Sequence, residues 1–320
     1  MRDTREQPVG LWIGIDVGGT KIDAVLVDRT ARIVADRNTL TGAVDGEAAV
    51  MDRIAGLVRE LAAEAGDLPI HGMGLGCPGQ VNPAAGVVRA AVNLGWFNVA
   101  LRAGLQERLQ GVPGADSIVL ANDVNALALG EYRFGLGRGA NDLVYLALGT
   151  GLGGGAIVNG QIVGGDNDFA MEVGHMSLRP NGRRCGCGML GCPEAYASGT
   201  GMLTGVTERL RDFPGSQLAG EKTLTTPHIL TAARAGDALA RQVVDEAAEM
   251  LGIVMTICAT ILNPNLFVIG GGLGRAAADL LLPRAEEVFR ARVLFPGSER
   301  ASIQMASVER AAVGAASLTM

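Results

Sequence analysis

The sequence predicts an α/β fold built from two lobes of similar plan. The first observation is an internal repeat: a strand, a glycine-rich turn and a second strand occur around Gly18-Gly19 and again around residues 149–155. The second observation is that buried strands and amphipathic helices follow each of these hairpins, as is typical of α/β folds. A chain of 320 residues with 48% apolar content can form two sizeable cores.

In the first lobe, a Gly-Gly pair between two apolar runs predicts a hairpin, and apolar residues then recur at helical spacing. The elements expected here, in chain order, are strands at 11–17 and 22–28, a helix at 47–65, a strand at 71–76, a helix at 101–109, a strand at 117–121 and a helix at 124–134.

In the second lobe, Asn159-Gly160 predicts a tight turn between short strands. We place the first lobe at 1–121 and the second at 122–304, and expect a final helix within about 305–320 to pack back on the first lobe. The elements expected in the second half are strands at 142–148, 156–158 and 161–163, a helix at 237–262, a strand at 266–269, and helices at 275–293 and 308–318.

The composition argues against several classes of protein. The net charge of −6 and the 4% aromatic content do not suit a nucleic-acid partner. No run of 18 apolar residues predicts a membrane span, and residues 1–10 lack the apolar core of a secretory leader. Three of the five cysteines lie within eight residues, which favours a metal site over a disulfide framework, so we expect a reducing cytoplasm.

The first glycine turn, Asp16-Val17-Gly18-Gly19-Thr20-Lys21, is a candidate phosphate site. Glycines let backbone N–H groups approach phosphate oxygens, Thr20 adds a hydroxyl and Lys21 a positive charge. Asp16, at the strand end, is placed to orient the water shell of Mg²⁺. An ordinary hairpin with flanking charges is the alternative interpretation.

The second glycine segment, residues 149–155, contains a formal G-x-G-x-x-G match. The dinucleotide-binding fingerprint requires a helix after these glycines, whereas we expect a hairpin, so that interpretation fails. The chain has no Walker A sequence. Two glycine turns, each between two strands, favour a nucleotide held from both lobes.

Asn122-Asp123 lies between an expected strand and an expected helix. A carboxylate at this point can accept the proton of an attacking hydroxyl, and the helix N-terminus favours its ionised form. The position also suits a plain N-cap residue, and the two roles are compatible.

The most specific motif lies in the segment 172–194. An imidazole and three thiolates form the ligand set of a closed, structural zinc site, so the metal should shape a loop without doing chemistry. Glu172 and Glu194 flank the ligands and are candidates to bind sugar hydroxyls. The alternative is a set of unrelated thiols beside two surface glutamates. The four expected ligands are His175, Cys185, Cys187 and Cys192.

Taken together, these motifs resemble the ROK family (repressors, open reading frames and kinases) of the actin-like ATPase superfamily, from about Ile13 to the C-terminus. The segments Cys77–Gln80, Asn93–Trp96 and Gly270–Leu273 are similar to further loops of that family. The resemblance implies a two-lobed actin-like (ribonuclease H-like) fold with a nucleotide and sugar cleft between the lobes. It implies Asp123 as the catalytic base, with His175 both a zinc ligand and a sugar contact. The sugar contacts that it implies are Gly79, Asn93, Asn122, Asp123, Glu172, His175 and Glu194. The nucleotide contacts that it implies are Asp16, Gly18, Gly19, Thr20, Lys21, Gly149, Thr150, Gly151, Gly271 and Gly272.

The activity that the resemblance implies is ATP-dependent phosphorylation of a free hexose at its 6-hydroxyl, with glucose favoured. Kinases for fructose, N-acetylmannosamine or N-acetylglucosamine are the alternatives. The implied cofactors are ATP, Mg²⁺ and structural Zn²⁺, and a homodimer or homotetramer is expected. A sugar-responsive repressor would need a DNA-binding module before the first strand, which begins by residue 11, and a non-catalytic sensor would be expected to lack Asp123.

Three places depart from the family pattern: Met171 stands where glycine is common, residues 166–169 (DNDF) are unusual, and Pro193 replaces a common leucine. These departures lie near the expected sugar site and leave its preferred hexose open. We favour glucose because Glu194 and His175 should crowd an N-acetyl group at C2, and because Pro193 stiffens the loop.

Overall fold

The computed structural model describes residues 10–294, 300–308 and 310–320. The prediction that residues 1–10 form no secretory leader concerns, apart from Gly10, residues outside the described ranges. Position 309 of the predicted last helix also lies outside them. The chain divides into two compact units. Unit 1 runs to Gly139 and includes Ile162–Ala170 and Ser307–Met320, and unit 2 comprises Ala140–Gln161 and Met171–Ala306.

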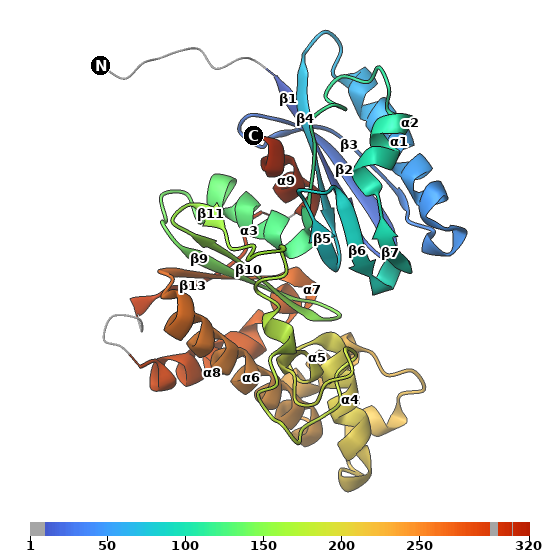
Figure 1. The fold of residues 1–320 in the computed structure, drawn as a ribbon. Helices are drawn as coiled ribbons and strands as arrows, with labels where there is room; N and C mark the ends of the chain where they lie inside the picture. Colours follow the sequence, from blue (N-terminus) through green and yellow to red (C-terminus); the bar gives the residue numbers. More distant parts are fainter. Residues whose placement is uncertain (1–9, 295–299, 309) are drawn as a thin grey trace. The chain divides into compact units, whose positions relative to one another are not determined.

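Unit 1 contains a five-stranded sheet with helices on both faces and a small three-stranded antiparallel sheet (Figure 1). Its strands are β1 (Leu11–Val17), β2 (Lys21–Asp28), β3 (Ile33–Leu40), β4 (Ile70–Cys77), β5 (Gln80–Asn82), β6 (Val87–Ala91), β7 (Trp96–Val99) and β8 (Ile118–Asn122). Its helices are α1 (Glu47–Glu64), α2 (Leu101–Arg108), α3 (Asp123–Phe134) and α9 (Ala311–Ala316).

Unit 2 contains the second five-stranded sheet and the long helix that the sequence predicts near its end. Its strands are β9 (Leu143–Leu148), β10 (Leu152–Val158), β11 (Gln161–Ile162, at the boundary with unit 1), β12 (Leu266–Gly270) and β13 (Ser302–Met305). Its α-helices are α4 (Gly199–Arg209), α5 (Thr226–Ala235), α6 (Ala238–Leu262), α7 (Gly271–Ala276) and α8 (Ala278–Arg292).

The two sheets have the same strand order. It is β3-β2-β1-β4-β8 in unit 1 and β11-β10-β9-β12-β13 in unit 2. In each sheet an antiparallel hairpin, β1–β2 or β9–β10, lies beside a strand that runs parallel to its first member. The repeat expected from the sequence is therefore confirmed, and with it the two-lobed α/β class.

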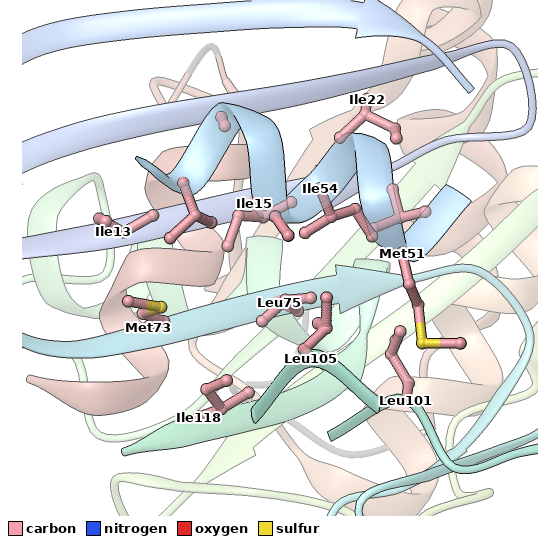
Figure 2. Packing of buried hydrophobic residues seen from close by; sticks show 14 of the residues in the cluster. Ile13, Ile15, Ile22, Met51, Ile54, Met73, Leu75, Leu101, Leu105 and Ile118 are labelled. Carbon is pink, nitrogen blue, oxygen red and sulfur yellow. The ribbon is translucent and has the colours of Figure 1, made fainter. Parts of the chain in front are cut away.

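The core of unit 1 follows from the period-two alternation of the hairpin strands. Ile13, Ile15 and Ile22 pack with residues of α1 and α2 in one buried cluster (Figure 2). Val25 and Val27 point to the opposite face and pack with α9. Each face of the sheet is thus apolar and is covered by helix.

Helix α9 approaches its sheet so closely that only glycine fits beneath it. A Cβ on Gly14 would lie 1.9 Å from the carbonyl oxygen of Ala312, and a Cβ on Gly74 would lie 1.8 Å from that of Ala315. The small residues of α9 allow this backbone contact, which draws the last described residues of the chain into the first unit.

Several elements differ from the sequence predictions. Strand β3 was not predicted because its large apolar residues, Ile33, Val34 and Leu40, are exposed and polar side chains interrupt it at an edge position. Strand β10 begins at Leu152 instead of residue 156, because the glycines themselves pair with β9. The helix expected at 275–293 is two helices, α7 and α8, and α3 lies in unit 1, beyond the boundary that we placed after residue 121. Within the described ranges, no helix has both the length and the apolar character needed to cross a bilayer.

Candidate active site

The first glycine turn closes the β1–β2 hairpin of unit 1. The Gly18 amide donates to the Lys21 carbonyl at 3.0 Å. The buried Thr41 fixes the turn, because its hydroxyl donates to the Gly18 carbonyl at 2.6 Å and its amide donates to the Thr20 carbonyl at 2.9 Å. Gly19, Thr20 and Lys21 are exposed. This turn therefore presents its backbone and Lys21 to solvent, where an anionic ligand can bind.

Lys21 is only loosely held by its neighbours. Its Nζ lies 3.5 Å from Oδ1 of Asp23, and its side chain is 53% exposed. Asp23 is engaged more strongly by Arg310, which donates to both of its carboxylate oxygens at 3.0 and 2.7 Å. The positive charge of Lys21 thus stays available to a ligand.

Two carboxylates meet at the carboxyl edge of the same sheet. Asp16 lies near the end of β1, beside Gly76 of β4, and Asn122 ends β8 beside Cys77 of β4. Burial raises the pKa of Asp16 to about 7, and the negative charge of Asp123 adds to the effect. Burial also raises the pKa of Asp123, while its hydrogen bond from the Val124 amide opposes the shift. The pair is typical of a site that binds a cation or moves a proton.

The capping residue of α3 is Asn122, not Asp123. Its Oδ1 accepts from the amides of Val124 at 2.9 Å and Asn125 at 3.3 Å. Its Nδ2 donates to the carbonyl of Gly79 at 3.0 Å. Asp123 occupies the first helical position, where Oδ1 accepts from the Val124 amide at 2.9 Å. Asn122 therefore caps two of the first amides of α3, so Asp123 is not needed as the cap and can act as a base.

The remaining predicted sugar contacts of unit 1 lie on neighbouring loops. Gly79 has a φ of 81°, and a Cβ there would lie 2.2 Å from the Ala90 carbonyl oxygen, so glycine is required. Asn93 is exposed in the 3-10 helix η2 (Val92–Leu94), and its Cβ would be 3.4 Å from a Cβ placed on Gly19. Asn93 therefore lies beside the first glycine turn, and Gly79 lies beside the cap of α3.

The second glycine turn lies in unit 2 beside a pocket of about 500 Å³. Helices α4, α5 and α7 all begin at this pocket, and helix N-termini favour anionic groups. Gly271 has a φ of 81°, and a Cβ on it would lie 2.2 Å from the Leu148 carbonyl oxygen. The pocket is lined by Gly149, Thr150, Gly199, Thr200, Leu203, Thr226, Pro227, Leu230, Gly272, Leu273 and Ala276.

Sequence reasoning found Gly149, Thr150 and Gly272 of this lining and missed the residues of α4 and α5. A signal for both helices exists. Ser198 before Gly199 is a typical N-cap residue, and its side chain does cap α4. Thr225 is also of a type favoured at N-caps and precedes an early proline, although its side chain makes no capping hydrogen bond. That both helices begin at one pocket depends on the tertiary fold.

The four predicted metal ligands do come together in unit 2. Their ligand atoms all lie within 4.8 Å of one another. The Cys187 and Cys192 sulfurs are 3.7 Å apart, as are the Cys185 sulfur and Nδ1 of His175. Ligands about 2.3 Å from a tetrahedral zinc ion would be about 3.8 Å apart, so the set fits that ion. Burial raises the pKa of the Cys185 thiol to about 12, so a cation would have to displace its proton.

Glu194 lies between this cluster and the second glycine turn. Its Oε2 accepts from the Leu152 amide at 3.0 Å. Its Oε1 lies 3.4 Å from the Cys185 sulfur and 4.0 Å from Nδ1 of His175. Glu172 is exposed at the start of the 3-10 helix η3 (Val173–His175) that carries the histidine. Unit 2 thus brings Glu194, the cluster and the glycine turn together.

Met171 adopts a backbone conformation that favours glycine. Its φ is 67°. This is the position at which the sequence departs from the glycine common in the family, so the departure places a bulky side chain in a strained conformation. The strain adjoins Glu172, one of the predicted sugar contacts.

An ionic network, here called the Glu246 network, fastens the cysteine-bearing loop to α6. Glu246 accepts from Arg179 at 2.8 Å and from Arg183 at 2.7 Å, and it also pairs with Arg209. Arg179 and Arg183 lie on the ring of Tyr196, each 4.6 Å from its centroid. These contacts anchor one side of the loop independently of the thiols.

Comparison with known proteins agrees with this geometry. The family model described as "ROK family" matches residues 12–320 of this chain. A glucokinase of Halalkalibacterium halodurans is 38% identical over 279 residues, which cover 85% of this chain and 83% of that protein. A glucokinase of Thermotoga maritima is 35% identical over 281 residues, which cover 86% of each.

A solved structure supports the same assignment. The ROK family glucokinase from Streptomyces griseus, in complex with glucose and AMPPNP, has a TM-score of 0.79 at 33% identity, covering 97% of this chain and 99% of that one. The match therefore covers nearly the whole of both chains. The chain belongs to the ROK family and has its two-lobed actin-like fold.

Proposed function

We propose that this chain is a hexose kinase that transfers the γ-phosphoryl group of ATP to the 6-hydroxyl of a free hexose, with glucose preferred. The observation that carries the proposal is the placement of Asp123, a carboxylate of raised pKa at the start of α3 and at the same sheet edge as Asp16. Relatives named glucokinase, and a similar structure that binds glucose and AMPPNP, support the choice of sugar and donor.

The donor would use both glycine turns. The adenosine of ATP suits the pocket of unit 2, where leucines from α4, α5 and α7 offer apolar contact. Its phosphates would be bound by the turn at Gly149–Gly151 and by the turn at Gly18–Lys21. Mg²⁺, when bound with the nucleotide, would neutralise phosphate charge, and Asp16 would hold its water shell.

The proton chemistry falls to Asp123. The sugar hydroxyl oxygen attacks the γ-phosphorus, the bond to the β-phosphate oxygen breaks, and ADP leaves. The hydroxyl proton passes to the Asp123 carboxylate. A raised pKa makes this carboxylate a stronger base than an ordinary aspartate, which favours the transfer.

The other hydroxyls of the sugar would be bound by the polar set Asn93, Asn122, Glu172, His175 and Glu194, with the backbone of Gly79. His175 and the three cysteines would hold Zn²⁺ in a closed, structural site. In that role the metal fixes the loop that presents Glu194. A site that reads hydroxyls by hydrogen bonds discriminates strongly against analogues that leave its groups unpaired.

The test is a coupled assay of kcat/KM for glucose, mannose, fructose, N-acetylglucosamine and N-acetylmannosamine, with ATP or polyphosphate as donor. We expect the highest value for glucose with ATP, and a kcat at least about 100-fold lower for Asp123→Asn. A higher value for either N-acetyl sugar would refute the preference for glucose but not the hexose kinase. Absence of phosphorylation of every sugar would refute the kinase.

Two further parts of the proposal concern state and compartment. We propose a homodimer or homotetramer, to be measured by light scattering after size exclusion. We propose a reducing compartment, because the thiols of Cys185, Cys187 and Cys192 must stay reduced to bind zinc. Metal analysis of protein purified without added metal should give about one zinc per chain.

A further inference from the structure

Glu194 has contacts in three directions. Its Oε1 faces the metal cluster, 3.4 Å from the Cys185 sulfur. Its Oε2 accepts from the amide of Leu152, next to the second glycine turn, at 3.0 Å. Its backbone carbonyl accepts from the hydroxyl of Ser198 at 2.7 Å. One residue thus contacts the metal cluster, the phosphate turn and the start of α4.

Ser198 connects Glu194 to helix α4. It is fully buried, and its hydroxyl accepts from the Gly201 amide at 3.0 Å while it donates to the Glu194 carbonyl. The same oxygen therefore caps α4 and fixes the backbone of Glu194. The Ser198 hydroxyl itself is buried, so a shift of Glu194 that broke its hydrogen bond would leave a buried donor unpaired.

Helix α4 in turn forms one wall of the nucleotide pocket. Gly199 and Thr200 line the pocket, and the Gly199 amide donates to the Gly149 carbonyl at 2.9 Å. A Cβ on Gly201 would lie 2.6 Å from the carbonyl oxygen of Glu194, so little space exists between the helix and that residue. Glu194 and the first turn of α4 must therefore move together.

We propose that Glu194 and Ser198 couple metal occupancy to nucleotide affinity, an inference that rests on the proposed nucleotide pocket and zinc cluster. Cys192 is the residue before the 3-10 helix η4 (Pro193–Ala195) that carries Glu194. Metal bound to Cys192 fixes the start of this short helix. The position of this short helix then fixes α4 through the hydrogen bond of Ser198, and it fixes the phosphate turn through the hydrogen bond of the Leu152 amide. The contacts are contiguous, as transmission by packing requires.

Loss of the metal need not unfold the loop. The Glu246 network holds the arginine-bearing side of the loop to α6 and involves none of the four ligands. Zinc-free protein should keep its fold and lose only the fixed position of Glu194. The effect of the metal on the pocket can therefore be measured by binding, without turnover.

The experiment is titration calorimetry of ADP with Mg²⁺ into zinc-loaded protein, and into protein stripped of zinc with a chelator that is then removed. For the wild type we expect the Kd of ADP to rise about tenfold on zinc removal, within the usual range of coupling between sites. Ser198→Gly removes the hydroxyl and both of its hydrogen bonds, but glycine at an N-cap costs the helix little stability, so α4 should persist and this ratio should fall below about twofold. Metal analysis should still show one zinc per chain in that variant.

The matched control is Thr207→Ala on the same helix, which removes an exposed hydroxyl bonded to the Leu203 carbonyl at 2.8 Å. This variant should keep the wild-type ratio. If the glycine variant misfolds, Ser198→Ala with a native circular dichroism spectrum provides a second measurement of the ratio of ADP Kd values without and with zinc. Equal ADP affinity of zinc-loaded and zinc-free wild type, or a tenfold ratio kept in both Ser198 variants, would overturn the coupling. No ADP binding to zinc-loaded wild type would instead overturn the proposed function, and the coupling with it.

Discussion

Asp16 should make the protein less stable at neutral pH than at acidic pH, and Asp16→Asn should remove that penalty. The structure holds this carboxylate near the end of β1, where burial, Asp123 and Asp23 all disfavour its charge and Lys21 only partly compensates. The amide of asparagine has nearly the same shape and carries no charge. Asp16→Asn should therefore raise stability while it removes the group that we propose to hold the magnesium water shell.

The size of the effect follows from the pKa. The folded pKa of Asp16 is about 7, against 3.8 for an unperturbed aspartate. At about 1.4 kcal/mol for each pKa unit, the three units cost up to about 4 kcal/mol at pH 7. Because the folded pKa is the higher one, the stability contributed by protonated Asp16 is fully present below pH 3.8. That contribution is lost as the pH rises to about 7. Above pH 7 the difference between the two proteins should stay constant.

The assay is urea unfolding of wild type and Asp16→Asn, followed by circular dichroism, at pH 5 and pH 8. The gain in midpoint should be clearly larger at pH 8. Asp28→Asn, at the other end of the same hairpin, is the matched control of opposite sign. Hydrogen bonds from Thr30 and Arg32 outweigh partial burial and lower the pKa of Asp28, so that variant should lose stability at pH 8. An Asp16→Asn gain that is equal at both pH values, or a loss at pH 8, would refute the reasoning.

Four further outcomes are expected. Asp123→Asn should keep its hydrogen bond from the following amide and its fold, but lose at least about 100-fold in kcat in the coupled assay; near-normal turnover would exclude it as the base. Gly74→Ala places a Cβ 1.8 Å from the Ala315 carbonyl oxygen and should lower the free energy of unfolding, measured with urea, by about 1–3 kcal/mol, whereas an unchanged free energy would mean that α9 is not docked. Met171→Gly relieves a φ of 67° and should gain up to about 1 kcal/mol in the same assay; a loss would show that the methionine side chain stabilises the loop. Cys187→Ser should reduce bound zinc, measured by mass spectrometry, to well below one atom per chain, and full occupancy would exclude this thiol as a ligand.

Local patterns predicted much of this fold. The two hairpins followed from glycine pairs between apolar runs, and the metal cluster followed from ligand types within one short segment. The order of strands in each sheet could not follow from such patterns, because β1 and β4 are far apart in the chain and pair only in the tertiary structure. Strand β3 escaped prediction for a related reason, since an exposed edge strand needs no apolar run.

The candidate site shows the same division. Asn122 and Asp123 were recognised as a pair, but which of them caps α3 depends on side-chain geometry that the sequence does not carry. The contact of Glu194 with the Leu152 amide spans 42 positions and has no sequence signal. Thr200 joins the nucleotide pocket only because α4 begins beside the second glycine turn.

The packing of α9 has a consequence for the order in which the chain folds during synthesis. In the sequence, almost all of unit 2 comes after the first segment of unit 1 and before its last segment. A ribosome therefore makes unit 2 before residues 307–320. Until then Val25 and Val27 lack the helix that buries them, although most of unit 1 was made first. A nascent chain truncated just before Ser307 would therefore contain a complete second unit and an unfinished first one. Protease digestion of a released chain that ends at Ala306 should cut residues 10–139 and spare unit 2.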